Sequence, residues 1–346
     1  MDYAVESLIK IAVMIGALLG AVAYLVLAER KVSAYIQNRL GPNRVGPWGL
    51  LQPMADGLKF LFKEDVIPGH VNRLIYVAAP PAILVPALMA FAIVPVGDTI
   101  PILGKQIQMQ VADVNIGVLY LLALASLGVY GIVLGGWASN NKYALLGAIR
   151  ASAQMISYEL SLGLSLVGVL MVAGSLRLGE IVEQQANTTL LGFLPDWNVF
   201  SQPLAFLLFT VAAFAEANRL PFDLPESEQE LVAGYHAEYS SMKFAMFFMA
   251  EYASMITASA VIASLFFGGW HVPWLIQPGD QSLFASLLKI LAFSLKTGFF
   301  MFLFLWVRWT LPRFRYDQVM WLGWKVMLPL AIMNVFLTGL VLTLAR

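Results

Sequence analysis

Eight apolar runs of about 20 residues each divide this chain from end to end, and that length is what a helix needs to cross the hydrocarbon core of a bilayer. Of the 346 residues, 60% are hydrophobic and 12% are charged, whereas about a quarter of a typical soluble domain is charged. The sequence therefore predicts an all-α, polytopic membrane protein with a single membrane domain, 1–346. The predicted spans cover roughly residues 8–28, 74–96, 114–136, 152–174, 200–217, 243–267, 284–307 and 320–344.

The distribution of basic residues between the spans predicts the orientation of the chain. Fifteen of the 21 lysines and arginines fall in the connections after spans one, three, five and seven, and five fall on the opposite side. Basic connections stay in the cytoplasm. We therefore expect cytoplasmic loops at 29–73, 137–151, 218–242 and 308–319, with both termini on the periplasmic side.

Composition also limits the chemistry of the chain. Lysine plus arginine and aspartate plus glutamate both number 21, so nothing predicts a nucleic-acid partner. The chain has no cysteine to ligate an iron–sulfur cluster, and its three histidines lie in connections rather than at haem-ligating positions inside spans. We expect no metal, flavin or haem in this chain and no complete catalytic centre.

The connection from Ala215 to Lys243 is an acidic hinge between two apolar runs. Neighbouring carboxylates raise one another's pKa, which lets them exchange protons near neutrality. Asp223 and Glu226 also fit an alternative role, as the N-cap and capping-box partner of a helix. The six carboxylates of the hinge are Glu216, Asp223, Glu226, Glu228, Glu230 and Glu238.

Three ionisable residues, Glu159, Glu251 and Lys296, fall well inside predicted spans. Each costs about 2.5–3.5 kcal/mol at a helix centre, so each is expected to face the bundle interior. Lys296 could form an ion pair with one of the two acids. A pair would still leave one acid without a base, and an intramembrane acid of this kind is a candidate proton carrier.

The long first connection contains an amphipathic segment. Leu51, Met54, Leu58 and Phe62 recur at helical spacing, with Asp56 among the polar residues on the other face. This pattern predicts a helix at the membrane interface, either as part of a site or as a plain surface anchor.

Four long motifs carry a family resemblance that covers essentially the whole chain. They resemble the H subunits of the bacterial NADH–quinone oxidoreductases, respiratory complex I, which are the counterparts of the first subunit of the mitochondrial enzyme. The motifs are ERKVSAYIQNRLGPNRVGPWGLLQPMADGLK from Glu29, NNKYALLGAIRASAQMISYEL from Asn140, AEANRLPFDLPESEQELVAGYHAEYSSMKF from Ala215, and WVRWTLPRFRYDQVMWLGWK from Trp306.

The resemblance implies roles for particular residues. Arg30, Arg39 and Asp56 would belong to a cavity for ubiquinone or menaquinone, which a neighbouring subunit reduces. The implied partners are peripheral-arm subunits of the quinone site, small and antiporter-like membrane subunits, and the lipid of a bacterial inner membrane. The implied proton path comprises Glu159, Glu216, Asp223, Glu226, Glu228, Glu230 and Glu251.

Other functions remain open at this point. A homologous subunit of a membrane-bound hydrogenase would share the fold but not necessarily the quinone. An independent secondary transporter could use Glu159, Glu251 and Lys296 as its ion site, although the sequence shows no internal repeat of the kind common in transporters. A structural anchor is disfavoured by the intramembrane acids.

Overall fold

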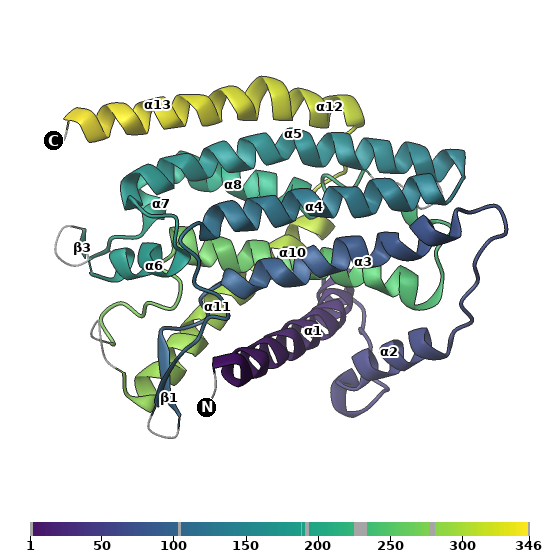
Figure 1. Cartoon of the computed structure of the whole chain (residues 1–346), viewed down its shortest axis with the longest axis horizontal. Helices are drawn as coiled ribbons and strands as arrows, with labels where there is room; N and C mark the ends of the chain where they lie inside the picture. Colours follow the sequence, from purple (N-terminus) through teal and green to yellow (C-terminus); the bar gives the residue numbers. More distant parts are fainter. Residues whose placement is uncertain are drawn as a thin grey trace.

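The computed structural model describes residues 3–102, 105–187, 189–190, 194–224, 234–276 and 281–344, and within these ranges the chain is a bundle of long helices (Figure 1). Seven helical segments have the length and apolar composition to cross a membrane. The predicted all-α polytopic class is confirmed. The spanning segments are α1 (Tyr3–Ile36), α3 (Arg73–Ala90) with η2 (Phe91–Ile93), α4 (Gly117–Ala138), α5 (Lys142–Ala173), α10 (Ser241–Phe266), α11 (Leu283–Thr310), and α12 (Tyr316–Trp321) continuing through the π-helix η4 (Leu322–Met327) into α13 (Leu328–Leu344).

The fifth predicted span, 200–217, contains a shorter helix than expected. A one-turn helix, α7 (Asn198–Ser201), is followed by α8 (Pro203–Glu216), whose 14 residues rise only about 21 Å. Asn198 donates to the carbonyl of Leu265 at one end of α10, while Ser241 begins α10 at the other end. The segment therefore starts near the C-terminal end of α10, and its helix ends beside α5, where Gln154 donates to the carbonyl of Ala215 at 2.8 Å.

Two other helices run past their predicted bounds, and a side-chain cap accounts for the early start of α5. The predicted span at 152–174 begins at Lys142 in the structure, because the Asn141 side chain caps the first turn of α5 by accepting from the amide of Tyr143. The same helix ends where Gly174 adopts a left-handed conformation, with a φ of 67°. The first span likewise continues as helix to Ile36, so the predicted loop 29–73 starts inside α1.

The bundle has two distinct ends. The α2 end carries η1 (Pro47–Gly49), α2 (Gln52–Phe62) and η3 (Gly234–His236). The hairpin end carries both chain termini (Figure 1). It also carries α6 (Leu178–Asn187) and two antiparallel hairpins, β1 (Thr99–Ile102) with β2 (Lys105–Gln108), in which Thr99 pairs with Gln108, and β3 (Thr189–Leu190) with β4 (Leu194–Pro195).

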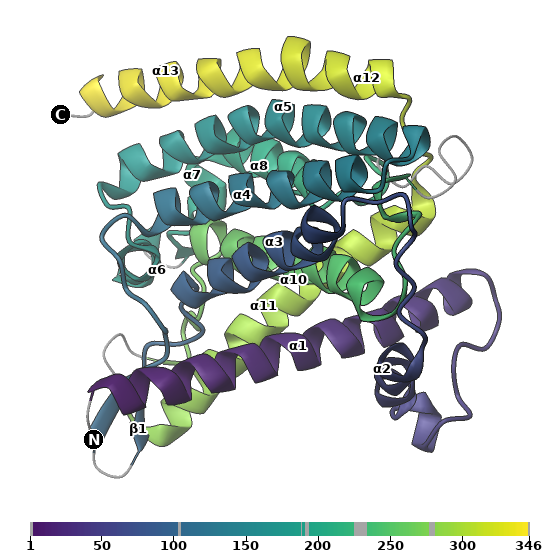
Figure 2. The same cartoon turned by 45° about the vertical axis from the view of Figure 1, so that its right-hand side comes forward.

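Helix α2 lies beside the last turns of α1 (Figure 2). Its apolar residues, including Met54, Leu58 and Phe62, are exposed, whereas Asp56 and Gln52 are partly buried on the other face. The C-terminal end of α2 is held by the Ser241 hydroxyl, which lies 2.9 Å from the carbonyl of Phe60. The exposed apolar face is that of the predicted amphipathic helix.

Candidate functional site

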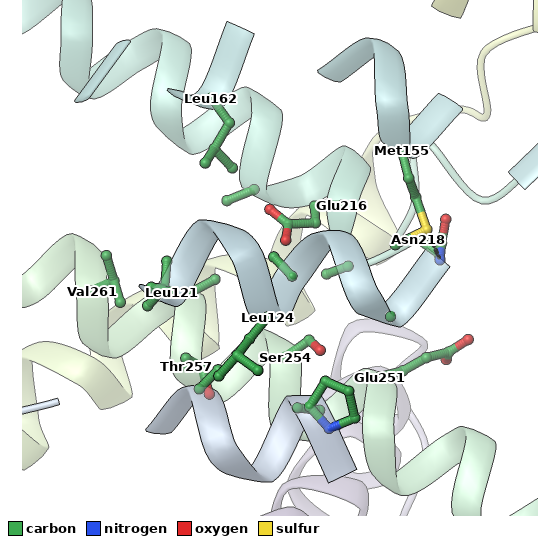
Figure 3. Close-up of a pocket in the computed structure, with 18 of the residues that line it drawn as sticks. Leu121, Leu124, Met155, Leu162, Glu216, Asn218, Glu251, Ser254, Thr257 and Val261 are labelled. Carbon is green, nitrogen blue, oxygen red and sulfur yellow. Dashed lines mark hydrogen bonds between the residues drawn. The ribbon is translucent and has the colours of Figure 1, made fainter. Parts of the chain in front are cut away.

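A cavity of about 70 Å³ lies among α3, α4, α5, α8 and α10. Its polar lining includes Glu216, Asn218, Glu251, Ser254 and Thr257, and most of the remaining wall is apolar. Glu216 lies near the middle of this lining, and Glu251 lies at its margin (Figure 3). A space of this size with several polar partners can hold water molecules.

Glu216 is the last residue of α8 and lines the cavity from the same face of that helix as Phe209 and Ala213. The chain turns just after Glu216, where Asn218 adopts a positive φ of 49° and Pro221 follows. Glu159 on α5 lies close enough to Glu216 for the two charges to interact. Glu159 also accepts a hydrogen bond from Ser126 on α4. The structure thus brings together two predicted proton-path acids from different helices.

Glu251 connects the cavity with the later part of the acidic hinge. The buried hydroxyl of Tyr235, in η3, donates to the Glu251 carboxylate at 2.9 Å. The carboxylate is itself buried, with 7% of the residue exposed. The hydrogen bond therefore links α10 directly to η3, in the later part of the hinge.

A buried cluster around Glu29 was not predicted from the sequence. The Tyr252 hydroxyl donates to Glu29 Oε2 at 2.6 Å, and Arg308 donates to the other carboxylate oxygen. Arg219 Nη1 lies 3.6 Å from Glu29 Oε2, and its guanidinium stacks 4.2 Å from the centre of the Tyr252 ring. Four segments of the chain therefore meet around one carboxylate.

Arg30 and Asp56 form an ion pair between α1 and α2. Arg30 Nη1 lies 2.7 Å from Asp56 Oδ2, and Gln52 donates to the other Asp56 oxygen at 3.0 Å. The side chain of Arg30 is 48% exposed, so the pair lies at the surface of this chain. Arg39 follows the end of α1, and its contact there is a hydrogen bond to Gln37.

Asp223, in the first half of the hinge, forms an ion pair with the connection between α11 and α12. Its Oδ2 accepts from Arg313 at 2.8 Å, and the amide of Phe314 donates to the carbonyl of Pro221. The other predicted hinge acids of the proton path, Glu226, Glu228 and Glu230, lie outside the described residues. The predicted capping box of Asp223 and Glu226 lies partly outside them as well.

The predicted ion pair of Lys296 with Glu159 or Glu251 is corrected by the structure. The Lys296 ammonium donates to three carbonyls, those of Phe267, Gly269 and His271, at 2.8 to 2.9 Å. An ammonium has three N–H bonds, and these carbonyls use all of them. Glu251 lies 16 residues earlier in the chain than Phe267, about 24 Å along a helix. Lys296 therefore caps the far end of α10.

Within the described ranges, no group of three or more His, Cys, Asp or Glu residues could hold a metal ion. The arrangement is instead one of carboxylates, arginines and hydroxyls. Such groups can bind and release protons and can stabilise an anion.

Comparison with known proteins identifies the family. A sequence profile described as NADH dehydrogenase matches residues 9–339. The NADH-quinone oxidoreductase H subunit 1 of Cytophaga hutchinsonii is 50% identical over 343 residues, 98% of each chain. The chain belongs to the family of NADH–quinone oxidoreductase H subunits. The H subunit of Thermomicrobium roseum is 54% identical over 331 residues, 95% of this chain and 94% of its own, and the H subunit 1 of Geobacter metallireducens is 49% identical over 344 residues, 99% and 98%.

Membership makes this chain a multi-pass membrane subunit of respiratory complex I, as the resemblance implied. The family resemblance had not drawn attention to Glu29, Arg219 and Arg308. One signal was present in the sequence, because Arg219 and Arg308 follow the apolar runs that end at residues 217 and 307. Their shared partner is 190 and 279 residues away along the chain, so the sequence does not reveal it.

Proposed function

We propose that this H subunit forms part of the quinone-binding cavity of its complex and couples quinone reduction to proton translocation through a chain of carboxylates. The observation that carries the proposal is that Glu216 and Glu251, from α8 and α10, line one water-sized cavity inside the bundle. A third acid, Glu159, lies close enough to Glu216 for the two charges to interact. Reduced quinone needs protons, and such a cavity supplies groups that can deliver them.

The quinone part of the proposal rests on the arginines near α2. A reduced quinone is transiently anionic, and a guanidinium stabilises an anion. Arg30 with Asp56 lies between α1 and α2, and Arg39 lies just beyond α1. The exposed apolar face of α2 suits contact with lipid, from which a hydrophobic quinone would arrive.

The carboxylate chain would begin near the quinone. The Glu29 cluster lies one residue from Arg30, and its Arg219 lies between Glu216 and the hinge acid Asp223. From there Glu216, Glu251 and Glu159 lead into the bundle, with the remaining hinge acids Glu226, Glu228 and Glu230 contributing charge near the start. Quinone chemistry would act on this chain by changing the charge or conformation of the hinge.

Orientation, partners and quinone complete the proposal. The α2 end faces the cytoplasm of a bacterial inner membrane, which leaves both termini in the periplasm. Peripheral-arm subunits meet the α2 end, and the small and antiporter-like membrane subunits continue the proton path. The quinone is ubiquinone or menaquinone, and the chain itself supplies no metal, flavin or haem.

The test is Glu216→Gln in the intact complex. The amide keeps the shape of the side chain but cannot carry a proton. We expect proton pumping per NADH oxidised to fall at least about tenfold, because a positioned proton-transfer group typically contributes about 10²- to 10⁴-fold. Pumping is measured as acidification of inverted membrane vesicles during NADH oxidation with quinone.

Glu6→Gln is the matched control. It makes the same change in a glutamate that lies outside the proposed proton path, in the first turn of α1, where Glu6 pairs with Lys10. Subunit content is measured for both variants, so that a failure of assembly is not mistaken for a loss of coupling. A fully assembled Glu216→Gln complex that pumps at the wild-type ratio would refute the role of Glu216. Inhibitor-sensitive NADH–quinone activity that co-purifies with the tagged chain would exclude a hydrogenase complex.

A further inference from the structure

Five phenylalanines lie between the acid-lined cavity and the hairpin end of α10. Phe209 lines the cavity, and its ring centre lies 5.8 Å from that of Phe266. Phe206 lies next to Phe266 and Phe267, at 5.5 and 5.4 Å. Phe300 of α11 completes the group at 5.1 Å from Phe267. We refer to these five residues as the phenylalanine plug.

The Lys296 ammonium lies immediately beyond the phenylalanine plug. It donates to the carbonyl of Phe267 at 2.8 Å and to two further carbonyls, those of Gly269 and His271. The ring of Trp197 lies 5.0 Å from the ammonium. Contacts therefore run continuously from the cavity wall through the plug to a fixed positive charge.

The helix that joins these features offers little for water to bind. Residues 259–266 of α10 are all buried. Its two serines in this stretch, Ser259 and Ser264, donate their hydroxyls to carbonyls one turn earlier, those of Met255 and Ala260, at 2.8 and 2.9 Å. A chain of water molecules along this part of α10 would have few partners.

The histidine beside Lys296 does not provide a proton acceptor at neutral pH. His271 lies in the connection after α10, and burial together with the Lys296 ammonium lowers its pKa to about 4. Its imidazole is therefore uncharged and a weak base at pH 7.

We propose that the phenylalanine plug and Lys296 form a barrier that stops protons in the Glu216–Glu251 cavity from reaching the hairpin end of this subunit. The apolar rings exclude water, and the desolvated ammonium opposes an approaching positive charge. The three carbonyls hold that charge in place. Protons that enter the cavity must then leave it sideways, toward partner subunits, or return to the α2 end.

The inference rests on the proposed function only in that the cavity holds protons. The barrier is tested without NADH oxidation. The barrier proposal can therefore fail while Glu216 is still needed for pumping, and the role of Glu216 can fail while the barrier holds. The purified complex is reconstituted into liposomes, a pH gradient is imposed, and the rate of its decay is measured with a trapped pH dye. Wild type, Lys296→Met, Lys296→Arg and Phe206→Ala are compared at equal subunit content.

Lys296→Met removes the charge and leaves three carbonyls without a donor, so proton leak should rise at least about tenfold, the effect of lowering a barrier by about 1.4 kcal/mol. Lys296→Arg keeps the charge and several N–H donors and should leak as the wild type does. Phe206→Ala opens the plug but breaks no side-chain hydrogen bond of the barrier, so it too should leak. Lys289→Met is the matched control, because Lys289 lies on the same helix but pairs with Asp98.

The proposal is overturned if Lys296→Met and Phe206→Ala complexes both hold the gradient as well as the wild type. It is also overturned if Lys289→Met leaks as much as Lys296→Met, because the leak would then follow general damage to α11. If Lys296→Met does not assemble, Phe206→Ala decides the question: a faster decay supports the barrier, and a wild-type decay refutes it.

Discussion

Replacing Glu29 by alanine is expected to destabilise the subunit by about 3–5 kcal/mol, the usual result of removing one partner from a buried ion pair. Glu29 is 7% exposed and accepts from Arg308 and Tyr252, with Arg219 at 3.6 Å. Without the carboxylate, the buried guanidinium of Arg219 and the partly exposed guanidinium of Arg308 remain with less negative charge to balance them. We therefore expect little assembled complex in the membrane and a lower thermal midpoint for whatever assembles.

The control for Glu29→Ala is Tyr252→Phe. It removes one hydrogen bond to the same carboxylate and keeps the ring that stacks on Arg219, so its cost should be about 1.5–3 kcal/mol. Both variants are measured by subunit content of the membranes and by thermal unfolding of the purified complex. If Glu29→Ala is no more damaging than Tyr252→Phe, the arginines do not depend on Glu29.

Replacing Gly136 by alanine is expected to disrupt the packing of α4 on α5. An added Cβ would lie 2.3 Å from the Cβ of Ala148 and 2.6 Å from the carbonyl oxygen of Ala144. Both neighbours belong to a helix backbone or lie directly on it, so neither can move alone. Overpacking of this kind costs about 1–3 kcal/mol and occasionally more. Because Glu159 and Ser126 meet across the same two helices, quinone reductase activity should fall as well.

Gly163→Ala provides the comparison for Gly136→Ala. Gly163 also lies inside α5, but its nearest neighbour would be 3.9 Å from an added Cβ, an ordinary contact. Alanine is favoured over glycine within a helix by about 1 kcal/mol, so this variant should be at least as stable as the wild type. Thermal unfolding and NADH–quinone activity are measured for both. Equal stability of the two variants would show that α4 and α5 can separate without cost.

The fold was largely predictable because a membrane-spanning helix can be recognised from its own segment of the sequence. A run of about 20 apolar residues identifies a span whatever lies beside it. Helix bounds were less predictable, because α1 and α5 extend beyond their apolar runs into polar residues. A cap such as Asn141, rather than the end of the apolar run, decides where α5 begins. Span 200–217 was misjudged in continuity, because Gln202 has a non-helical backbone that separates α7 from α8, whereas the end of α8 at Glu216 agrees with the predicted end to within one residue.

The candidate site was predictable in its residue types but not in its contacts. Acids inside apolar runs stand out because a charge in a membrane is costly, and Glu159 and Glu251 were identified in that way. The same argument suggested a carboxylate partner for Lys296, yet backbone carbonyls at the end of α10 satisfy its ammonium instead. The sequence does not reveal that carbonyls at the end of α10 lie within hydrogen-bond distance of Lys296, which belongs to another helix.

By itself, the sequence determined that this chain spans a membrane, which of its connections are basic, and which charged residues need an explanation. Hydrophobicity, charge and span length are properties of short segments, so they can be interpreted without a structure. Only the tertiary structure decided that Glu29 joins Arg219 and Arg308, that Glu216 and Glu251 share one cavity, and that Lys296 closes the far end of α10. These contacts depend on how helices that are far apart in the sequence pack against one another. The packing of each helix depends in turn on the side chains of all its neighbours.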